Sequence, residues 1–170
     1  VLAIVPLKAN SRRLPNKNFL SFGGRPLAWH IISSLVEADG IDDVYVFASN
    51  PKLMDLLPSG AKYLKRESML DADTVTGTEL FHSAFAKVEY DVGVISHATN
   101  PFIKPSTLAR AVAGVTGDIY DSAFACQKHK TYAWFEGKPL NYCLDSMAQT
   151  QDLSPVELET SGFYVFERNL

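Results

Sequence analysis

The first 36 residues of the chain lack acidic side chains, because the first Asp or Glu is Glu37. The cations of this stretch therefore have no carboxylate nearby in the sequence, and they are Lys8, Arg12, Arg13, Lys17 and Arg25. The whole chain carries a formal net charge of -3, so the positive field is local. A local positive field favours a small phosphorylated ligand and argues against a nucleic acid or a membrane surface as partner.

The two commonest glycine-rich phosphate loops are also absent. Neither G-x-x-x-x-G-K-[ST] nor G-x-G-x-x-G occurs anywhere in the 170 residues. The second absence argues against a dinucleotide-dependent oxidoreductase. A loop with little glycine cannot rely on close approach of its backbone, so its side chains must supply the contacts to a phosphate.

Cysteines and long apolar runs are scarce. Cys126 and Cys143 are too few for a disulfide framework and have no second cysteine at metal-ligand spacing, so we expect free thiols in a reducing cytoplasm. The apolar run of residues 1–7 is too short for a signal peptide or a membrane span. Neither a membrane nor a nucleic acid is predicted as a partner.

Apolar strands and amphipathic helices alternate along the chain. Strand-like runs cover residues 1–7, 44–48, 61–65, 92–96 and 122–127, and helical spacing covers residues 26–39, 51–57, 80–88 and 105–114. Such alternation predicts an α/β fold with a mostly parallel sheet. With 46% hydrophobic residues, the chain suits one globular domain, residues 1–170.

The basic loop of residues 8–18 reads Lys-Ala-Asn-Ser-Arg-Arg-Leu-Pro-Asn-Lys-Asn and directly follows the first predicted strand. Its guanidinium, ammonium, hydroxyl and amide groups can all donate to phosphate oxygens. In α/β folds, ligands bind at loops that leave the carboxyl ends of strands. The simpler alternative is a solvated basic surface.

This loop, followed by Gly-Gly-Arg-Pro-Leu at residues 23–27, resembles the start of the acylneuraminate cytidylyltransferases, the CMP-sialic acid synthetase family. The family loop reads roughly A-R-x-x-S-K-G-x-P-x-K-N before G-x-P-L. Matching positions are Ser11, Pro15, Lys17 and Asn18, whereas Lys8 and Arg12 keep the charge and Arg13 replaces a glycine.

The resemblance implies a three-layer α/β/α nucleotide-diphospho-sugar-transferase-like fold. It implies an enzyme that couples CTP to a 2-keto sugar acid, N-acetylneuraminate-like, and releases pyrophosphate. Lys8, Arg12 and Lys17 would bind the triphosphate, while Ser11 and Asn18 would donate to phosphate or ribose. A ketodeoxyoctonate or other sugar-acid cytidylyltransferase, or a non-catalytic binding protein of the same fold, remains as an alternative.

Residues 66–78 resemble a family segment, R-P-x-x-L-A-x-D-x-x-S, that lines the nucleotide base and ribose. This resemblance implies that the nucleotide is contacted by Arg66, Thr74, Thr76 and Gly77. A threonine here can instead cap the helix that follows.

Residues 97–105 resemble the family's L-Q-P-T-S-P-x-R, with Thr99 and Pro101 retained and His97 in place of Gln. We expect the sugar acid here, with His97 orienting its attacking hydroxyl or accepting its proton. Lone histidines are usually structural, which is the alternative. Ketodeoxyoctonate enzymes of this type place an acid in this segment, and its lack here favours the sialic-acid branch.

Residues 128–158 break the α/β alternation and contain Tyr-Ala-Trp-Phe-Glu-Gly-Lys-Pro-Leu at 132–140. The family uses this region to contact a second subunit, so a homodimer is expected; an ordinary hairpin over its own core is the alternative. Ser161 stands at the Asn position of the family's N-G-x-x-Y-I strand. The family's acidic Mg²⁺ ligands would lie beyond Leu170, so we expect the C-terminal part of the fold to be missing and assign no metal ligand within the chain.

Overall fold

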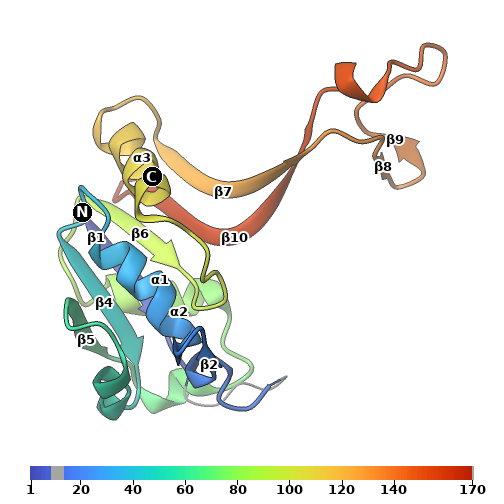
Figure 1. Cartoon of the computed structure of the whole chain (residues 1–170). Helices are drawn as coiled ribbons and strands as arrows, with labels where there is room; N and C mark the ends of the chain where they lie inside the picture. The colour runs from blue at the N-terminus through green and yellow to red at the C-terminus, as the bar shows by residue number, and fades with distance from the viewer. Residues whose placement is uncertain (9–13, 170) are drawn as a thin grey trace. The chain divides into compact units, whose positions relative to one another are not determined.

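The computed structural model describes residues 1–8 and 14–169 (Figure 1). The chain divides into two compact units, the first made of Val1–Phe124 and Gly162–Leu170 and the second of Ala125–Ser161. Two strands, β7 (Ser122–His129) and β10 (Val156–Glu167), begin in one unit and end in the other.

A six-stranded sheet with the order β5-β4-β1-β6-β10-β7 forms the centre of the fold. Its first four strands in this order are β5 (Ala61–Lys65), β4 (Asp43–Ala48), β1 (Leu2–Pro6) and β6 (Val92–Ser96). These four run parallel, whereas β10 pairs antiparallel with β6. The mostly parallel sheet that the sequence predicts is therefore confirmed. The continuous apolar run of β1 is explained by its burial, because Leu2, Ala3, Ile4 and Val5 are all buried.

Helices cover both faces of this sheet. On one face, α2 (Gly77–Phe85) packs Ala84 and Phe85 against Leu2, Ile4 and Phe47. On the other, α1 (Leu27–Val36) lies in front of the strands in Figure 1 and contacts α3 (Pro105–Thr116). The result is the expected three-layer α/β/α arrangement.

Gly93 in β6 permits the close packing of the α2 face. A Cβ atom at this position would lie 2.9 Å from the rings of Phe85 and Phe166. The side-chain-free backbone thus lets two aromatic rings meet at 5.3 Å between their centroids above the strand.

Short elements connect the layers. The segment after the basic loop forms a 3-10 turn, η1 (Lys17–Phe19), and then the hairpin of β2 (Ser21–Phe22) and β3 (Arg25–Pro26). The helix expected over residues 51–57 is a 3-10 helix, η2 (Pro51–Leu56), and η3 (Ser68–Asp71) follows β5.

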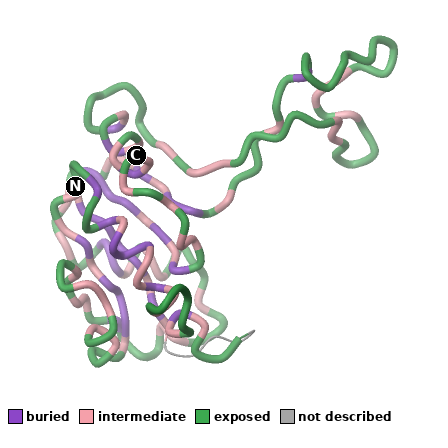
Figure 2. Tube along the Cα trace, in the orientation of Figure 1, coloured by how far each residue is buried: buried purple, intermediate pink, exposed green. Residues whose placement is uncertain are grey.

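The second unit contains the hairpin of β8 (Trp134–Phe135) and β9 (Lys138–Pro139) and the 3-10 turn η4 (Thr150–Asp152). All of its residues are described, and Leu153 alone among them is buried. Its tube is accordingly mostly in the colour for exposed residues in Figure 2. The segment of residues 128–158, where the sequence departs from α/β alternation, lies within this unit and does not enclose a core of its own.

Candidate active site

The topology marks one edge of the sheet as the place for a ligand. From β1 the chain moves outward to β4 and β5, and then returns to place β6 on the other side of β1. The strand order therefore reverses between β1 and β6, and ligands of open α/β sheets bind at the carboxyl ends of strands at such a point. The basic loop leaves β1 at this edge, and residues 97–104 leave β6 at the same edge.

Lys8 joins the end of β1 to the segment that follows β5. Its Nζ donates hydrogen bonds to the carbonyl oxygens of Asp71, at 2.8 Å, and Ala72, at 3.3 Å. The same Nζ lies 3.8 Å from Oδ1 of Asp73. Two segments that the sequence assigns to the triphosphate and to the base are thus in direct contact through one ammonium group.

Arg66 makes a second connection between β1, β4 and the segment after β5. Its side chain is fully buried. The guanidinium donates to the carbonyl oxygens of Leu7, at 2.7 Å, and Phe47, at 3.3 Å, and forms an ion pair with Asp71. Burial lowers the pKa of Arg66, and the charge of Asp71 opposes that shift. Because three elements converge on one guanidinium, Arg66 acts here as a positioning residue. The nucleotide contact that the family resemblance implies for Arg66 stays a prediction.

Lys17 and Asn18 lie in η1, directly after the part of the basic loop that contains Ser11 and Arg12, which fall outside the described residues. Asn18 is buried and its Nδ2 donates to the carbonyl oxygen of Lys8 at 3.2 Å. Lys17 forms no ion pair with any carboxylate in the described part of the chain. Asn18 thus holds the backbone of Lys8, whereas Lys17 is a cation that can bind an anion.

Thr76 is the N-cap of α2, and Gly77 is the first residue of that helix. Thr76 Oγ1 accepts from the amide of Glu79 at 3.2 Å, and a Glu79 carboxylate oxygen accepts from the Thr76 amide at 2.8 Å. The hydrogen bonds that the Thr76 amide and hydroxyl donate to the Glu79 carboxylate lower the pKa of Glu79. The capping alternative therefore holds for Thr76, whose T-x-x-E spacing is a capping box. Thr74 is exposed in the preceding loop.

His97 follows the last residue of β6 and is half-buried. Its ring contacts the ring of Phe81 in α2 edge-to-face, with 5.6 Å between centroids. Thr99, two residues on, is exposed, and the Asn100 amide closes a turn on the His97 carbonyl oxygen at 3.2 Å. The strand end therefore brings an imidazole and a hydroxyl to the carboxyl edge beside β1.

Ser161 lies in β10 within the second unit, where its backbone has a φ of 52°. A positive φ is unusual for a residue other than glycine and is tolerated best by Asn, Asp and Gly. The Asn of the resembling family motif therefore suits the conformation of this position.

A family model described as Cytidylyltransferase matches residues 2–154 of the chain, which includes both strand ends described above. The chain belongs to the cytidylyltransferase family. N-acylneuraminate cytidylyltransferase A of Danio rerio is 25% identical over 181 residues, an alignment that covers all of this chain and 42% of that protein.

Other cytidylyltransferases are similarly distant. CMP-N,N'-diacetyllegionaminic acid synthase of Legionella pneumophila is 30% identical over 119 residues, with 66% of this chain and 51% of the relative covered. The 3-deoxy-manno-octulosonate cytidylyltransferase of Escherichia coli is 25% identical over 116 residues, with 68% and 46% covered. The chain thus spans about two-fifths to half of the length of these curated relatives.

The fold is shared with solved structures of the same kind. The structure described as CMP:2-keto-3-deoxy-manno-octonic acid synthetase complexed with CTP superposes with a TM-score of 0.73 at 18% identity, covering 99% of this chain and 74% of that one. The nucleotidyltransferase-like fold expected from the sequence is therefore confirmed.

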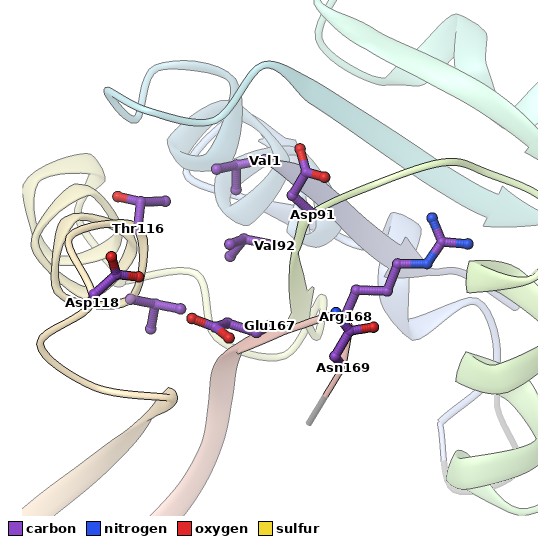
Figure 3. Close-up of a pocket in the computed structure, with 9 residues that line it drawn as sticks. Val1, Asp91, Val92, Thr116, Asp118, Glu167, Arg168 and Asn169 are labelled. Carbon is purple, nitrogen blue, oxygen red and sulfur yellow. The ribbon is translucent and has the colours of Figure 1, made fainter.

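A pocket of about 410 Å³ lies at the opposite edge of this cytidylyltransferase fold (Figure 3). It is lined by residues at the amino ends of β1 and β6 and at the carboxyl ends of α3 and β10, namely Val1, Asp91, Val92, Val115, Thr116, Asp118, Glu167, Arg168 and Asn169. It contains none of the predicted site residues. The candidate site therefore lies at the switch point and not in this cavity.

Neither a metal cluster nor a membrane helix is found in the part of the cytidylyltransferase chain that the structure describes. In residues 1–8 and 14–169, no three His, Cys, Asp or Glu side chains are grouped so that they could hold a metal ion. Among the same residues, no helix is long and apolar enough to cross a membrane. Two acids in the segment after β5 already have cationic partners. Asp71 forms an ion pair with Arg66, and Asp73 forms one with Lys8.

Proposed function

We propose that the protein transfers a cytidylyl group from CTP to a 2-keto sugar acid, N-acetylneuraminate-like, to give the CMP-sugar and pyrophosphate. A hydroxyl of the sugar acid attacks the α-phosphate of CTP, and the oxygen of the departing pyrophosphate takes the electron pair of the broken bond. Such reactions depend mainly on positioning and on neutralising charge. Family membership and the named activities of the relatives support this proposal.

The observation that carries the proposal is the contact of Lys8 with residues 71–73. It brings the cationic loop after β1 and the segment before α2 to the same edge, as a nucleoside triphosphate requires for simultaneous binding of its phosphates and its base. The first turns of α1 and α3 contain no acidic side chain that would repel a phosphate. Lys17, Arg12 and the third N–H of Lys8 would neutralise the triphosphate. Release of pyrophosphate from CTP in the presence of a sugar acid tests this directly.

His97 is proposed to position or activate the attacking hydroxyl. With His97→Gln, we expect turnover at saturating substrates to fall about tenfold or more, together with loss of the acidic limb of the pH–rate profile. Steady-state rates from pH 5 to 9 measure both. The matched control is His82→Gln, on the exposed side of α2. An unchanged profile with normal turnover would reduce His97 to a ligand contact at most.

A 3-deoxy-manno-octulosonate-type sugar acid is the second candidate substrate. It is favoured by the solved structure with the TM-score of 0.73 and by the Escherichia coli relative. The lack of an acid in residues 97–101 favours the N-acetylneuraminate-like substrate. The ratio of kcat/KM for these two acids with CTP distinguishes the two candidates.

A non-catalytic nucleotide or sugar-acid binding protein is the third candidate. CTP binding without release of pyrophosphate would identify it. Mg²⁺ remains our proposed cofactor; the described residues include no group of side chains that could hold it, and no step is assigned to it. We also retain the proposal of a cytoplasmic location, supported by the free thiols of Cys126 and Cys143.

A homodimer is proposed through the second unit. The side chains of Trp134 and Phe135 are 55% and 65% exposed, although Trp134 and Tyr132 both pack edge-on against Tyr142. Large exposed apolar side chains around a hairpin without a core are typical of a surface covered by a partner. A second copy of the chain is the partner that the family resemblance of residues 128–158 implies.

Replacing Trp134 by Ala is expected to weaken this dimer at least tenfold, because buried tryptophans carry much of the energy of an interface. Sedimentation velocity of the full gene product between about 1 and 50 μM should give a dimer for the wild type and a shift toward monomer for Trp134→Ala. Met69→Ala is the control, since Met69 is 77% exposed but lies in the first unit. A monomeric wild type at these concentrations would contradict the proposal.

A further inference from the structure

One aromatic contact joins the β2–β3 hairpin to the loop that leaves β6 at the switch point. The ring of Phe22, in the β2–β3 hairpin, meets the ring of Phe102, in the loop after β6, edge-to-face with 5.6 Å between centroids. Phe102 is 81% exposed and Phe22 is 40% exposed, so neither ring belongs to the hydrophobic core. A core-packing role therefore does not explain the pair.

Phe22 is held by its turn and by contacts with α1. The hairpin turns at Gly23 and Gly24, whose φ values of 57° and 82° suit glycine. His30 of α1 hydrogen-bonds through Nε2 to the Phe22 carbonyl oxygen at 2.7 Å, and the two rings contact at 5.4 Å. The hairpin follows η1 directly in the chain. Figure 1 shows β2 at the same end of the sheet as the carboxyl end of β4.

The Phe102 side carries the predicted sugar-acid residues. Phe102 follows Thr99 by three residues and His97 by five, in a loop between β6 and α3. Within this loop, the Asn100 amide donates to the His97 carbonyl oxygen. The ring pair therefore supplies a tertiary contact between this loop and the hairpin beyond the basic loop.

We propose that Phe22 and Phe102 are positioning residues that hold the sugar-acid loop in register with the β2–β3 hairpin, which follows Lys17 and Asn18 in the chain. This inference rests on the proposed function. An aromatic pair of this geometry contributes about 0.5 to 1.5 kcal/mol, which corresponds to roughly two- to tenfold in a rate or a binding constant. Displacement of a reacting group by a fraction of an ångström is enough to produce such losses.

The test is a double-mutant cycle in the full gene product. Phe22→Ala and Phe102→Ala should each lower kcat/KM for the sugar acid about three- to tenfold, while the KM for CTP changes less than twofold. The double variant should be no worse than the poorer single one, because either change alone removes the contact. Phe102→Tyr should keep most of the wild-type kcat/KM, because the aromatic ring remains. Ile119→Ala, a 67% exposed apolar side chain in the same unit, is the control.

A second readout does not depend on activity. Phe22→Ala should shift the backbone amide resonances of His97 and Thr99, whereas Ile119→Ala should leave them in place. Additive kinetic effects, an unchanged Phe102→Ala, or unshifted resonances would overturn the inference. If the wild type releases no pyrophosphate with any sugar acid, the proposed function fails and the amide resonances alone decide whether the contact positions the loop.

Discussion

Replacing Arg66 by Ala is expected to lower the free energy of unfolding by about 3 to 5 kcal/mol, the largest stability effect among the substitutions that we predict. The change removes donors from the carbonyl oxygens of Leu7 and Phe47, which are buried at the ends of adjacent strands, and leaves Asp71 without its ion partner. Breaking a buried, hydrogen-bonded charge pair has costs of this size. Total stabilities of single domains are only about 5 to 15 kcal/mol.

Urea denaturation followed by circular dichroism measures this loss. A shift of the midpoint by roughly 2 M with an unchanged slope is the expected result, given slopes of about 1 to 3 kcal/mol per molar for small proteins. Arg66→Lys should recover only part of the loss, since an ammonium cannot reproduce the planar fork of donors. Arg110→Ala, on the exposed side of α3, should stay within about 0.5 kcal/mol of wild type. Equal midpoints for Arg66→Ala and Arg110→Ala would contradict the structural role.

Replacing Lys17 by Ala is expected to lower CTP affinity and kcat/KM ten- to a hundredfold without loss of stability. A charge-assisted hydrogen bond to a phosphate contributes about 1.5 to 3 kcal/mol, and Lys17 has no described carboxylate that would compete for it. Arg12→Ala is expected to have a similar effect, although Arg12 lies outside the described residues.

Titration calorimetry with CTP and steady-state rates measure the two quantities for Lys17→Ala. The control is again Arg110→Ala, which removes one cation from a surface away from the basic loop. Near wild-type binding and turnover for both Lys17→Ala and Arg12→Ala would mean that residues 8–18 are only a solvated basic surface.

The parallel part of the sheet could be predicted from the sequence because β1, β4, β5 and β6 are short runs of apolar or alternating residues. The runs at residues 61–65 and 92–96 match β5 and β6, and the Pro105 start of α3 follows from the fixed φ of proline. The antiparallel direction of β10 could not be derived in this way, because periodicity carries no information on strand direction. The family resemblance supplied the order of the site segments.

The role of Arg66 could not be predicted, because nothing local in the sequence indicates that carbonyl oxygens from β1 and β4 converge on it. The hairpin at residues 21–26 was missed for a different reason. Its Gly23-Gly24 dipeptide is a turn signal, but the flanking strands have only two residues each and show no alternation. The capping box of Thr76 and Glu79, in contrast, is readable directly from the T-x-x-E spacing.

Pyrophosphate release by the full gene product, with Mg²⁺ present, tests the central claim most directly. CTP, UTP, ATP and GTP are each paired with N-acetylneuraminate, 3-deoxy-manno-octulosonate and related 2-keto sugar acids. We predict release with CTP at least tenfold faster than with the other nucleotides, only when a sugar acid is present, and with loss of release in Lys17→Ala. CTP binding without release from any pair, or equal release from all four nucleotides, would contradict the proposal that this protein is a sugar-acid cytidylyltransferase.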